Sequence, residues 1–371
     1  RNRLVRCDKS TCLEWGNVNG ENALNIESGP GGASKTVLDV KNLSVDIDVP
    51  AGVLHAVDKI SFHVDQGETL CIVGESGCGK SITSLAIMDL LPGRASLTAD
   101  TLMLEQENLL KIGKKEFAAL RGNRMGMIFQ DPMTSLNPVY RIGNQMEEVY
   151  IHHGKGGRKE ARDRAEYLLD KVGITAARSR LVQYPHQLSG GLRQRVMIAM
   201  TLMCGPTLVI ADEPTTALDV TIQAQILILL KDLQKEFNMA MVFITHDLGV
   251  VARIADRVAV MYAGSFVETG TAQEVFEKPI HPYTQGLMAC IPVPGSGKSG
   301  ERLGSIRGLV PALVGDLEGC MFRNRCDSVH KACETGYVGL NELSEGRGYR
   351  CRMSVEECIS AGTGNLLTTG V

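Results

Sequence analysis

The sequence predicts an α/β fold built on a parallel β-sheet. Residues 69–73, 208–211 and 239–245 are short apolar runs, typical of strands that are buried on both faces. Apolar residues recur at helical spacing over 80–91 and again over 222–237. Because strands and helices alternate along the chain, the strands are expected to lie parallel in one sheet.

Three further strands and a helical insert complete the predicted fold. Residues 38–49 and 55–64 form β-rich runs ahead of the first apolar strand, and residues 125–129 form another short one. From 143 to 203 the pattern is mostly helical, broken by a charged, glycine-bearing stretch over 152–159. This region is predicted to be a helical insert between two strands of the sheet.

The composition divides the chain into three parts. Residues 1–36 are rich in Asn, Gly, Ser and charged side chains and contain no apolar segment of the kind a signal peptide needs, so we expect a disordered leader or an over-extended reading frame. Residues 37–292 carry the strands and helices described above. After Pro292, Gly, Ser, Arg and Cys become frequent and periodicity is weak, which predicts a C-terminal extension over 293–371.

Length and charge exclude several classes of protein. With 371 residues, of which 44% are apolar, the chain is long enough for two or three domains with a sizeable core. Its 39 Lys and Arg against 42 Asp and Glu leave a formal net charge of −3, which gives no general attraction to nucleic acid or to an anionic membrane. No apolar run reaches the roughly 18 residues that a spanning helix needs, so the chain is not expected to cross a membrane by itself.

A glycine-rich loop between the first apolar strand and its helix predicts a phosphate-binding site. Residues 74–81 read G-E-S-G-C-G-K-S, which matches the pattern G-x4-G-K-S/T. Glycines let the backbone curl so that its N–H groups, together with the N-terminus of the next helix, face the phosphates of a nucleotide. Lys80 is predicted to bind the β- and γ-phosphates, and Ser81 to bind Mg²⁺. The predicted nucleotide-binding residues are Gly74, Glu75, Ser76, Gly77, Cys78, Gly79, Lys80, Ser81 and Ile82.

Polar residues at the ends of the other buried strands are placed to serve the same site. Asp212 and Glu213 follow the second apolar strand. A carboxylate there can reach the Mg²⁺ shell, and its neighbour can polarise a water for attack on the γ-phosphate. Gln130 ends the strand over 125–129, and His246 ends the third apolar strand. Taken alone, His246 is a strand-end histidine without a role.

A second helix start of the phosphate-binding kind lies far away in the sequence. Residues 188–195 read L-S-G-G-L-R-Q-R. Ser189 is placed to cap the helix that follows, and Gly190 and Gly191 leave its N-terminus bare for an anion. One nucleotide rarely needs two such starts from one chain, so we expect two chains, each lending this segment to the nucleotide of the other.

Together these residues resemble the nucleotide-binding subunits of ATP-binding cassette (ABC) transporters. The resemblance covers about residues 37–292 and rests on the P-loop, on Gln130, on Leu188 to Gln194, on Leu208 to Glu213 and on His246. It implies the fold of a P-loop NTPase cassette, with a RecA-like parallel sheet core, an antiparallel β subdomain and a helical insert. The cysteine-bearing C-terminal extension would follow this cassette.

The resemblance also implies a role for each matched residue. Glu213 would be the general base of an ATPase, and Asp212 would hold the Mg²⁺ shell together with Ser81 and Gln130. Gln130 would also sense the membrane subunit, and His246 would contact the γ-phosphate. The residues that act between two chains would be Ser189, Gly190 and Gly191, which bind the partner's ATP, and Asp219, which connects the two sites.

Two positions depart from the family pattern. In the segment over 188–194, Leu192 and not Gln follows the two glycines, a variation that importers of this kind tolerate. Upstream of the P-loop the family usually has an aromatic side chain that stacks on adenine. When this sequence is matched to the family pattern, Ile47 falls at that position. Without an aromatic at this position, nucleotide affinity is expected to rest mainly on the phosphates.

Two further segments resemble the oligopeptide/dipeptide importer branch of the family: residues 130–138, followed by Ile142-Gly143, and residues 281–285. Alone, Asn137-Pro138 would be a simple turn. The branch implies import of di- or oligopeptides by a complex with a second ATPase subunit bound head to tail, two permease subunits and an extracytoplasmic substrate-binding protein. The chain would lie peripherally on the cytoplasmic face of the inner or plasma membrane.

Four of the eleven cysteines lie close together in the extension: Cys320, Cys326, Cys333 and Cys351. Disulfides are not expected in a cytosolic ATPase, because that compartment is reducing, and metal ligation is the alternative. Zinc ribbons usually have two C-x2-C pairs, and this segment has none. The wide spacing favours a 4Fe–4S cluster, which some subunits of the peptide-importer branch carry, over zinc or unliganded thiols. Cys358 is an alternative fourth ligand.

Other functions are compatible with parts of the pattern. A soluble ABC ATPase acting on DNA or ribosomes usually has two cassettes or a long coiled-coil insertion, whereas this sequence has one cassette and no heptad run. A zinc-dependent nucleic-acid module in the extension is disfavoured by the net charge. Within the importer branch, nickel chelates and glutathione are alternative cargoes to peptides.

Overall fold

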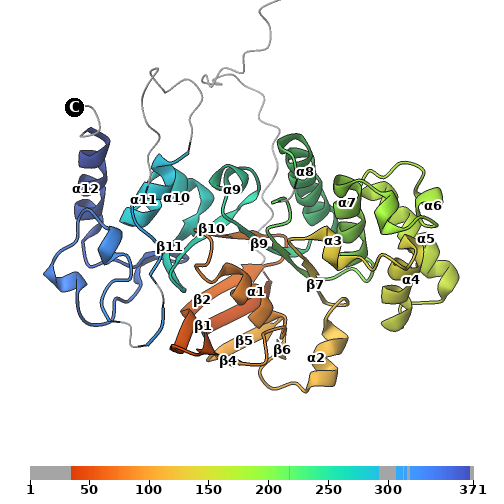
Figure 1. Ribbon diagram of the computed structural model, residues 1–371, viewed down its shortest axis with the longest axis horizontal. Coiled ribbons are helices and arrows are strands. Elements are labelled where there is room, and N and C mark those ends of the chain that lie inside the picture. The colour runs from red at the N-terminus through yellow and green to blue at the C-terminus, as the bar shows by residue number, and fades with distance from the viewer. Residues whose placement is uncertain (1–34, 217, 292–305, 312, 316–317, 368–371) are drawn as a thin grey trace, which may run out of the picture. The chain divides into compact units, whose positions relative to one another are not determined.

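A computed structural model describes residues 35–291, 306–311, 313–315 and 318–367, except residue 217 (Figure 1). The predicted leader over 1–36 lies outside these residues, apart from its last two. The described residues belong to one compact unit, in which two β-sheets carry the helices.

The larger sheet contains the predicted parallel strands. In the described residues it has eight strands, in the order β12-β13-β11-β10-β3-β9-β8-β7. The strands from β10 to β7 run parallel, and the predicted parallel sheet is therefore confirmed. These strands are β10 (Arg257–Tyr262), β3 (Thr69–Val73), β9 (Ala240–Thr245), β8 (Leu208–Asp212) and β7 (Met125–Ile128), and of these only β10 was not predicted.

Burial explains why the central strands are almost entirely apolar. Every residue of β3, β8 and β9 is buried. Alternate side chains of a strand point to opposite faces, so Cys71 and Val73 join the hydrophobic cluster on one face, and Leu70 and Ile72 join the cluster on the other. Both faces of the sheet are covered, so a polar side chain in these strands would lose its hydrogen bonds to water.

The other edge of this sheet is antiparallel and was not predicted. β11 (Ser265–Thr271) pairs with β10, β13 (Arg347–Tyr349) pairs with β11, and β12 (Asn341–Ser344) pairs with β13. The last two strands belong to the C-terminal extension, and at three and four residues they are too short to give a periodic pattern.

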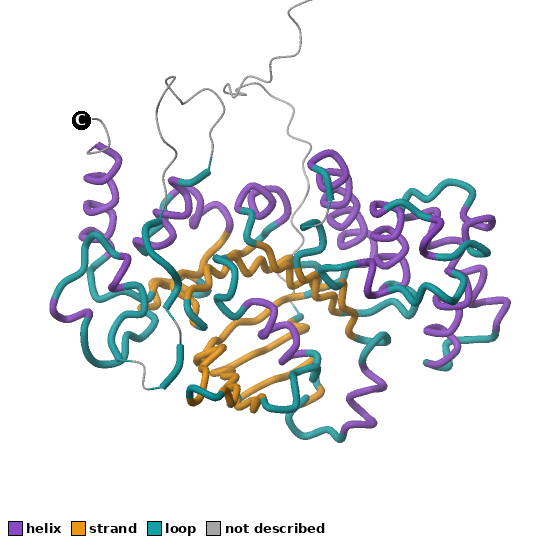
Figure 2. Tube along the Cα trace, viewed as in Figure 1, coloured by secondary structure: helices purple, strands orange, loops and turns teal. Residues whose placement is uncertain are grey.

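A smaller antiparallel sheet packs next to the larger one, below it in the view of Figure 1. Its strands are β2 (Gly52–Asp65), β1 (Thr36–Val49), β5 (Thr101–Leu104) and β6 (Glu107–Asn108), and β4 (Ala95–Thr98) pairs with β1. Helix α1 (Lys80–Ile87) packs against β1, β2 and β8 and so lies between the two sheets (Figure 2). Asp89, with a left-handed φ of 51°, follows the helix, which ends four residues before the predicted position.

The region over 143–203 is mostly helical, and α7 is its innermost helix. The helices are α4 (Ile142–His152), α5 (Arg158–Lys171), α6 (Ala177–Arg180) and α7 (Gly190–Thr201), and the short α3 (Pro132–Ser135) precedes them. The interruption over 153–157 falls in the glycine-bearing stretch that the sequence singled out. α7 packs against α3, α4, α5 and β7.

The remaining helices cover the larger sheet or connect its strands. They are α2 (Lys114–Leu120), α8 (Val220–Phe237), α9 (Leu248–Ile254), α10 (Ala272–Glu277), α11 (Pro282–Ala289) and α12 (Val355–Leu367). None of the described helices combines the length and the apolar character that spanning a membrane requires.

Candidate functional site

The loop from β3 to α1 is held in place by glycines that no other residue could replace. A Cβ on Gly74 would overlap the carbonyl oxygen of Met261 in β10, and a Cβ on Gly79 would overlap that of Ala56 in β2. Gly79 also has a φ of 107°, a conformation that L side chains rarely adopt. The loop is thus seated against both sheets.

The same loop and the start of α1 form an anion site. The ammonium group of Lys80 lies inside the curl of the loop and donates to the carbonyl oxygens of Gly74 at 2.8 Å and Glu75 at 2.9 Å. The N-cap residue Gly79 has no side chain, and the first turn of α1 has no acidic residue. The free N–H groups of the helix start and the lysine cation together favour phosphate.

A hydroxyl and a carboxylate meet beside this anion site. Ser81 Oγ donates to Asp212 Oδ1 at 3.0 Å, which joins the start of α1 to the end of β8. Burial raises the pKa of Asp212 above its ordinary value, and the hydrogen bond from Ser81 counters this in part. Hard oxygen atoms of this kind, next to phosphates, are the ligands that Mg²⁺ prefers. The residues present therefore fit a magnesium ion.

Glu213 lies at the centre of a polar group at the carboxyl ends of β7, β8 and β9. Gln130 Nε2 donates to its Oε2 at 3.3 Å, and His246 Nδ1 lies 3.2 Å from its Oε1. Thr216 Oγ1 donates to Oε2 at 2.9 Å; this contact was not predicted, although Thr216 follows Glu213 by only three residues. The backbone of Glu213 is left-handed, with φ 45°, and such strained residues concentrate at functional sites.

The second predicted anion site is an exposed helix start. Ser189 is the N-cap residue of α7, but its side chain makes no capping hydrogen bond, so the predicted cap is correct in position only. Ser189 and Gly190 are exposed, and the first turn of α7 has no acidic residue. Because α1 and α7 pack against different elements, the two helix starts belong to different parts of the unit (Figure 1).

Two other predicted positions have structural contacts. Asp219 is the N-cap residue of α8, and its carboxylate accepts hydrogen bonds from the N–H groups of Thr221 and Ile222. Ile47 lies in β1 between Leu54 of β2 and Ala95 of β4 and packs on the hydrophobic cluster that the smaller sheet shares with the larger one.

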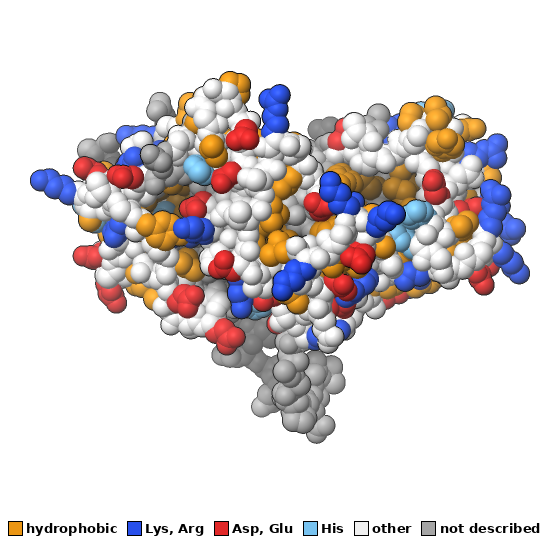
Figure 3. Space-filling view, turned by 90° about the horizontal axis from the view of Figure 1, so that it is seen from below, with side chains coloured by type: hydrophobic (Ala, Val, Ile, Leu, Met, Phe, Trp, Pro, Cys, Tyr) orange, Lys and Arg blue, Asp and Glu red, His pale blue; other side chains and the backbone are white. Residues whose placement is uncertain are grey.

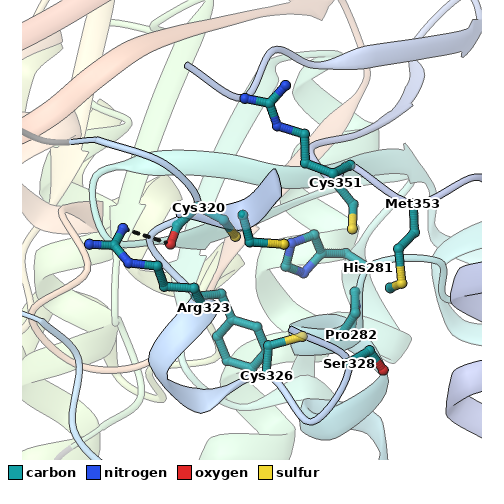
Figure 4. A pocket seen from close by; sticks show the side chains of 11 residues that line it. His281, Pro282, Cys320, Arg323, Cys326, Ser328, Cys351 and Met353 are labelled. Carbon is teal, nitrogen blue, oxygen red and sulfur yellow. Dashed lines mark hydrogen bonds between the residues drawn. The ribbon is translucent and has the colours of Figure 1, made fainter. Parts of the chain in front are cut away.

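The structure brings the four predicted cysteines of the extension to one cavity. Figure 4 shows Cys320, Cys326 and Cys351 turned toward the same space beside His281, and Cys333 also lines it. The cavity measures about 10 Å³, the room of one water molecule.

Cys358 lies apart from this cavity. Its side chain is fully buried beside Ile280 and Tyr349, and it forms a hydrogen bond with Cys351. It does not line the cavity, so the geometry favours Cys351 over Cys358 as the fourth ligand.

The cysteine arrangement differs from that of a single-ion site. In the part of the chain that the structure describes, no three or more His, Cys, Asp or Glu side chains are arranged to hold one metal ion. A single zinc ion, about 2.3 Å from each thiolate, draws its ligands within about 4 Å of one another. The thiolates of an iron–sulfur cluster bind different iron atoms and stand farther apart. Burial raises the pKa of the Cys326 thiol to about 11, so without a cation this thiol is neutral.

Two protein families match the chain. The ABC transporter family matches residues 57–216, and the C-terminal region of the oligopeptide/dipeptide transporters matches residues 267–333. The oligopeptide transport ATP-binding protein AppD of Bacillus subtilis (strain 168) is 48% identical over 325 residues, which cover 87% of this chain and 98% of that protein. The chain belongs to the ABC transporter family, in its oligopeptide/dipeptide branch.

Further relatives agree with this membership. The dipeptide transport ATP-binding protein DppD of Escherichia coli (strain K12) is 49% identical over 322 residues, 86% of this chain and 98% of that protein. Among solved structures, a dimer of the bacterial ABC transporter cassette MJ0796 matches with a TM-score of 0.57 and 27% identity, over 63% of this chain and 98% of that one. The same cassette in a post-hydrolysis state with ADP and Pi matches with a TM-score of 0.56 and 26% identity, over 63% of this chain and 98% of that one. As an ABC cassette, this chain is an ATPase.

Proposed function

We propose that this chain is the ATP-hydrolysing subunit of an ABC importer for di- or oligopeptides, with an ATP-binding domain over 37–292 and an importer-type extension over 293–371. One observation carries the proposal. The P-loop lysine, the pair of Ser81 and Asp212, and the group around Glu213 meet at one edge of the sheet, in a chain whose relatives are peptide-transport ATP-binding proteins.

Binding of ATP would rest on the P-loop. Lys80 and the N–H groups at the start of α1 would hold the β- and γ-phosphates, and the curled backbone of the P-loop would add its own N–H groups. Ser81, Asp212 and Gln130 would hold Mg²⁺, which when bound offsets the charge of the phosphates. Ile47 is aliphatic, so the base would contribute less to affinity than the phosphates do.

Hydrolysis would use Glu213 as the general base. Its carboxylate would accept a proton from the water that attacks the γ-phosphate. Gln130 and Thr216 both donate to Oε2, which orients the carboxylate. His246, beside Oε1, would contact the γ-phosphate.

Two ATPase subunits would act together. The exposed Ser189 and Gly190, with the half-buried Gly191, would bind the ATP held by a second, different ATPase subunit in a head-to-tail pair, and Asp219 would connect the two sites. The dimeric cassette among the structural neighbours supports a paired arrangement.

The membrane subunits would bind at the helical insert. Val139 and Tyr140, just before α4, are apolar and 71% and 56% exposed, which suits contact with a permease. Two permease subunits and an extracytoplasmic substrate-binding protein would complete the importer. The chain would then lie peripherally on the cytoplasmic face of the membrane.

The rival function is a soluble ABC ATPase that acts on nucleic acid. Figure 3 shows Lys and Arg side chains interspersed with Asp and Glu over the face that it views, and the net charge is −3. A nucleic-acid-binding protein is expected to gather its basic residues on one face.

Co-expression with candidate permeases separates the two functions. An importer subunit is expected to co-purify with two hydrophobic permeases, and its ATPase rate should rise when substrate-loaded binding protein is added. A rate that responds to DNA or RNA, with no permease retained, would contradict the proposal. Comparison of peptides, glutathione and nickel chelates on the same complex identifies the cargo.

We also propose that Cys320, Cys326, Cys333 and Cys351 hold a 4Fe–4S cluster. Their convergence on one cavity supports it. When bound, the cluster would cross-link the extension and could exchange one electron.

Metal analysis tests the cluster. After anaerobic purification, about four iron and four sulfide per chain are expected. Both should be lost in a Cys326→Ser, Cys333→Ser variant. One zinc per chain, or no metal, would overturn the assignment.

A further inference from the structure

The loop over residues 320–333, here called the cysteine loop, contains an arginine that forms an ion pair with the P-loop (residues 74–81). Arg325, which precedes Cys326, donates through Nη1 to Glu75 Oε2 at 2.5 Å and through Nη2 to Glu75 Oε1 at 2.9 Å. The Arg325 side chain is only 4% exposed. A two-point guanidinium–carboxylate pair of this kind fixes both distance and orientation. Glu75 is the second residue of the glycine-rich loop, so this pair joins the extension to the ATP site.

Arg325 is itself held from the other side. Its Nε donates to the carbonyl oxygen of Arg307 at 2.8 Å, and its guanidinium lies over the ring of Tyr262 at 5.7 Å. The arginine therefore reaches Glu75 in one defined position, set by the extension and by β10.

Glu75 is restrained at each of its polar groups. Its N–H donates to Tyr283 Oη at 3.0 Å, its carbonyl oxygen accepts from Lys80, and its carboxylate accepts from Arg325. Tyr283 is fully buried in α11. The position of Glu75 thus depends on residues that come 208 and 250 positions later in the chain.

An aromatic cluster connects the same contacts to the cysteines. Phe322, between Cys320 and Cys326, packs against Tyr262 with ring centroids 5.2 Å apart and against Tyr283 at 5.4 Å. Its side chain is buried. The conformation of the cysteine loop and the position of the Tyr283 side chain are therefore coupled by packing.

We propose that Arg325 is a positioning residue of the ATP site, which acts through Glu75. By neutralising the Glu75 carboxylate and fixing the first turn of the P-loop, it makes ATP affinity depend on the folded cysteine loop. The inference rests on the proposed ATP-binding function. Without Arg325, an unpaired negative charge would stand beside the phosphates and the loop would lose its outer support.

ATP affinity of three variants of the full chain tests this. Arg325→Gln is expected to raise the dissociation constant of a fluorescent ATP analogue about tenfold, and Arg325→Lys to raise it less, since lysine keeps the charge but loses the two-point geometry. Adding Glu75→Gln to Arg325→Gln removes the unpaired charge and should restore part of the affinity.

Arg323→Gln is the matched control. Arg323 lies in the same turn and donates only to carbonyl oxygens of its own loop, those of Glu318 and Cys320, among the contacts described. Its variant should bind ATP like the wild type. Equal weakening in both arginine variants, or wild-type affinity in Arg325→Gln, would overturn the inference. Failure of the wild-type chain to bind ATP would instead contradict the proposed function.

A second measurement starts from the wild-type chain, where the result does not depend on how well any variant folds. Coupling between two sites is reciprocal, so ATP should slow hydrogen–deuterium exchange over residues 320–333 of the wild-type chain. Arg325→Gln should abolish this slowing. If ATP does not change the exchange rate of this segment in the wild type, the contact does not couple the two sites, and the inference is overturned.

Discussion

Nδ1 of His246 lies 3.2 Å from Oε1 of Glu213, where the neighbouring parallel strands β9 and β8 end. The other carboxylate oxygen of Glu213 accepts hydrogen bonds from Gln130 and Thr216. The carboxylate is thus oriented from both sides, as a group that takes a proton from one particular water must be.

Glu213→Gln is expected to abolish hydrolysis and spare binding. Glutamine keeps the shape of the side chain but cannot accept the proton, so turnover should fall roughly a thousandfold. Phosphate release and ATP affinity, measured on the same preparation, check this. Near-normal hydrolysis would contradict the role assigned to Glu213. Thr216→Val, which removes only one orienting hydrogen bond, should cost much less.

Much of this site could be predicted because each component is local in sequence. The glycine-rich loop needs glycine for contacts that are now visible at Gly74 and Gly79. Asp212 ends β8 and Glu213 follows it, and the continuous apolar pattern of that strand already predicted a central position. Residues that end adjacent parallel strands must meet at one edge, so their convergence follows from the strand pattern.

Other features depend on contacts between distant segments, which no local pattern reports. The extension joins the sheet through β13, whose pairing with β11 involves only two residue pairs. The contact of Arg325 with Glu75 spans 250 positions. The left-handed backbone of Glu213 is likewise imposed by its surroundings and not by its residue type.

The P-loop glycines should differ sharply in their tolerance of alanine. Gly79→Ala combines a left-handed φ with overlap against the backbone of Ala56, and should lower the free energy of unfolding by about 2 to 5 kcal/mol. Gly77 also has a positive φ, of 79°, but a Cβ there meets nothing within 4 Å. Gly77→Ala should therefore cost only about 1 to 2 kcal/mol. Chemical denaturation of both variants gives the comparison, and equal costs would refute the steric account.

A buried ion pair is predicted to hold the extension on the sheet. Glu268 of β11 is fully buried, and its Oε1 lies 2.9 Å from Nη2 of Arg347 in β13. Burial raises the pKa of Glu268, and hydrogen bonds from the N–H groups of Ile280 and His281, with Arg347, counter this only in part. Arg347→Met leaves the carboxylate unpaired and should cost about 3 to 5 kcal/mol.

The double variant separates the charge from the packing. Arg347→Met with Glu268→Gln removes both charges and should recover part of the lost stability. Denaturation curves and the rate of proteolysis within the extension measure the effect. A double variant less stable than Arg347→Met would show that the unpaired charge matters less than the N–H groups of Ile280 and His281, one of which the glutamine amide leaves without an acceptor.

The ligand set of the cysteine cavity can be tested with two neighbouring thiols. Cys351 lines the cavity, whereas Cys358 is its buried neighbour outside it. If the cavity holds the proposed cluster, Cys351→Ser should lose most of the iron and Cys358→Ser should retain it. Iron and sulfide per chain, together with the visible absorption of anaerobic samples, give the answer. Loss of iron in Cys358→Ser alone would exchange the two assignments.

Asp219 combines a structural contact with a proposed role between subunits, and two substitutions separate them. Its carboxylate caps α8 through the N–H groups of Thr221 and Ile222. Asp219→Ala removes the cap and should cost about 1 kcal/mol of stability. Asp219→Asn keeps a capping oxygen and should leave stability nearly unchanged, because Asn and Asp are similar N-caps.

If Asp219 also connects two ATP sites, Asp219→Asn should still lower the ATPase rate of the assembled pair, because the negative charge is gone. A normal rate in Asp219→Asn with a reduced one in Asp219→Ala would mean that the residue acts only as a helix cap.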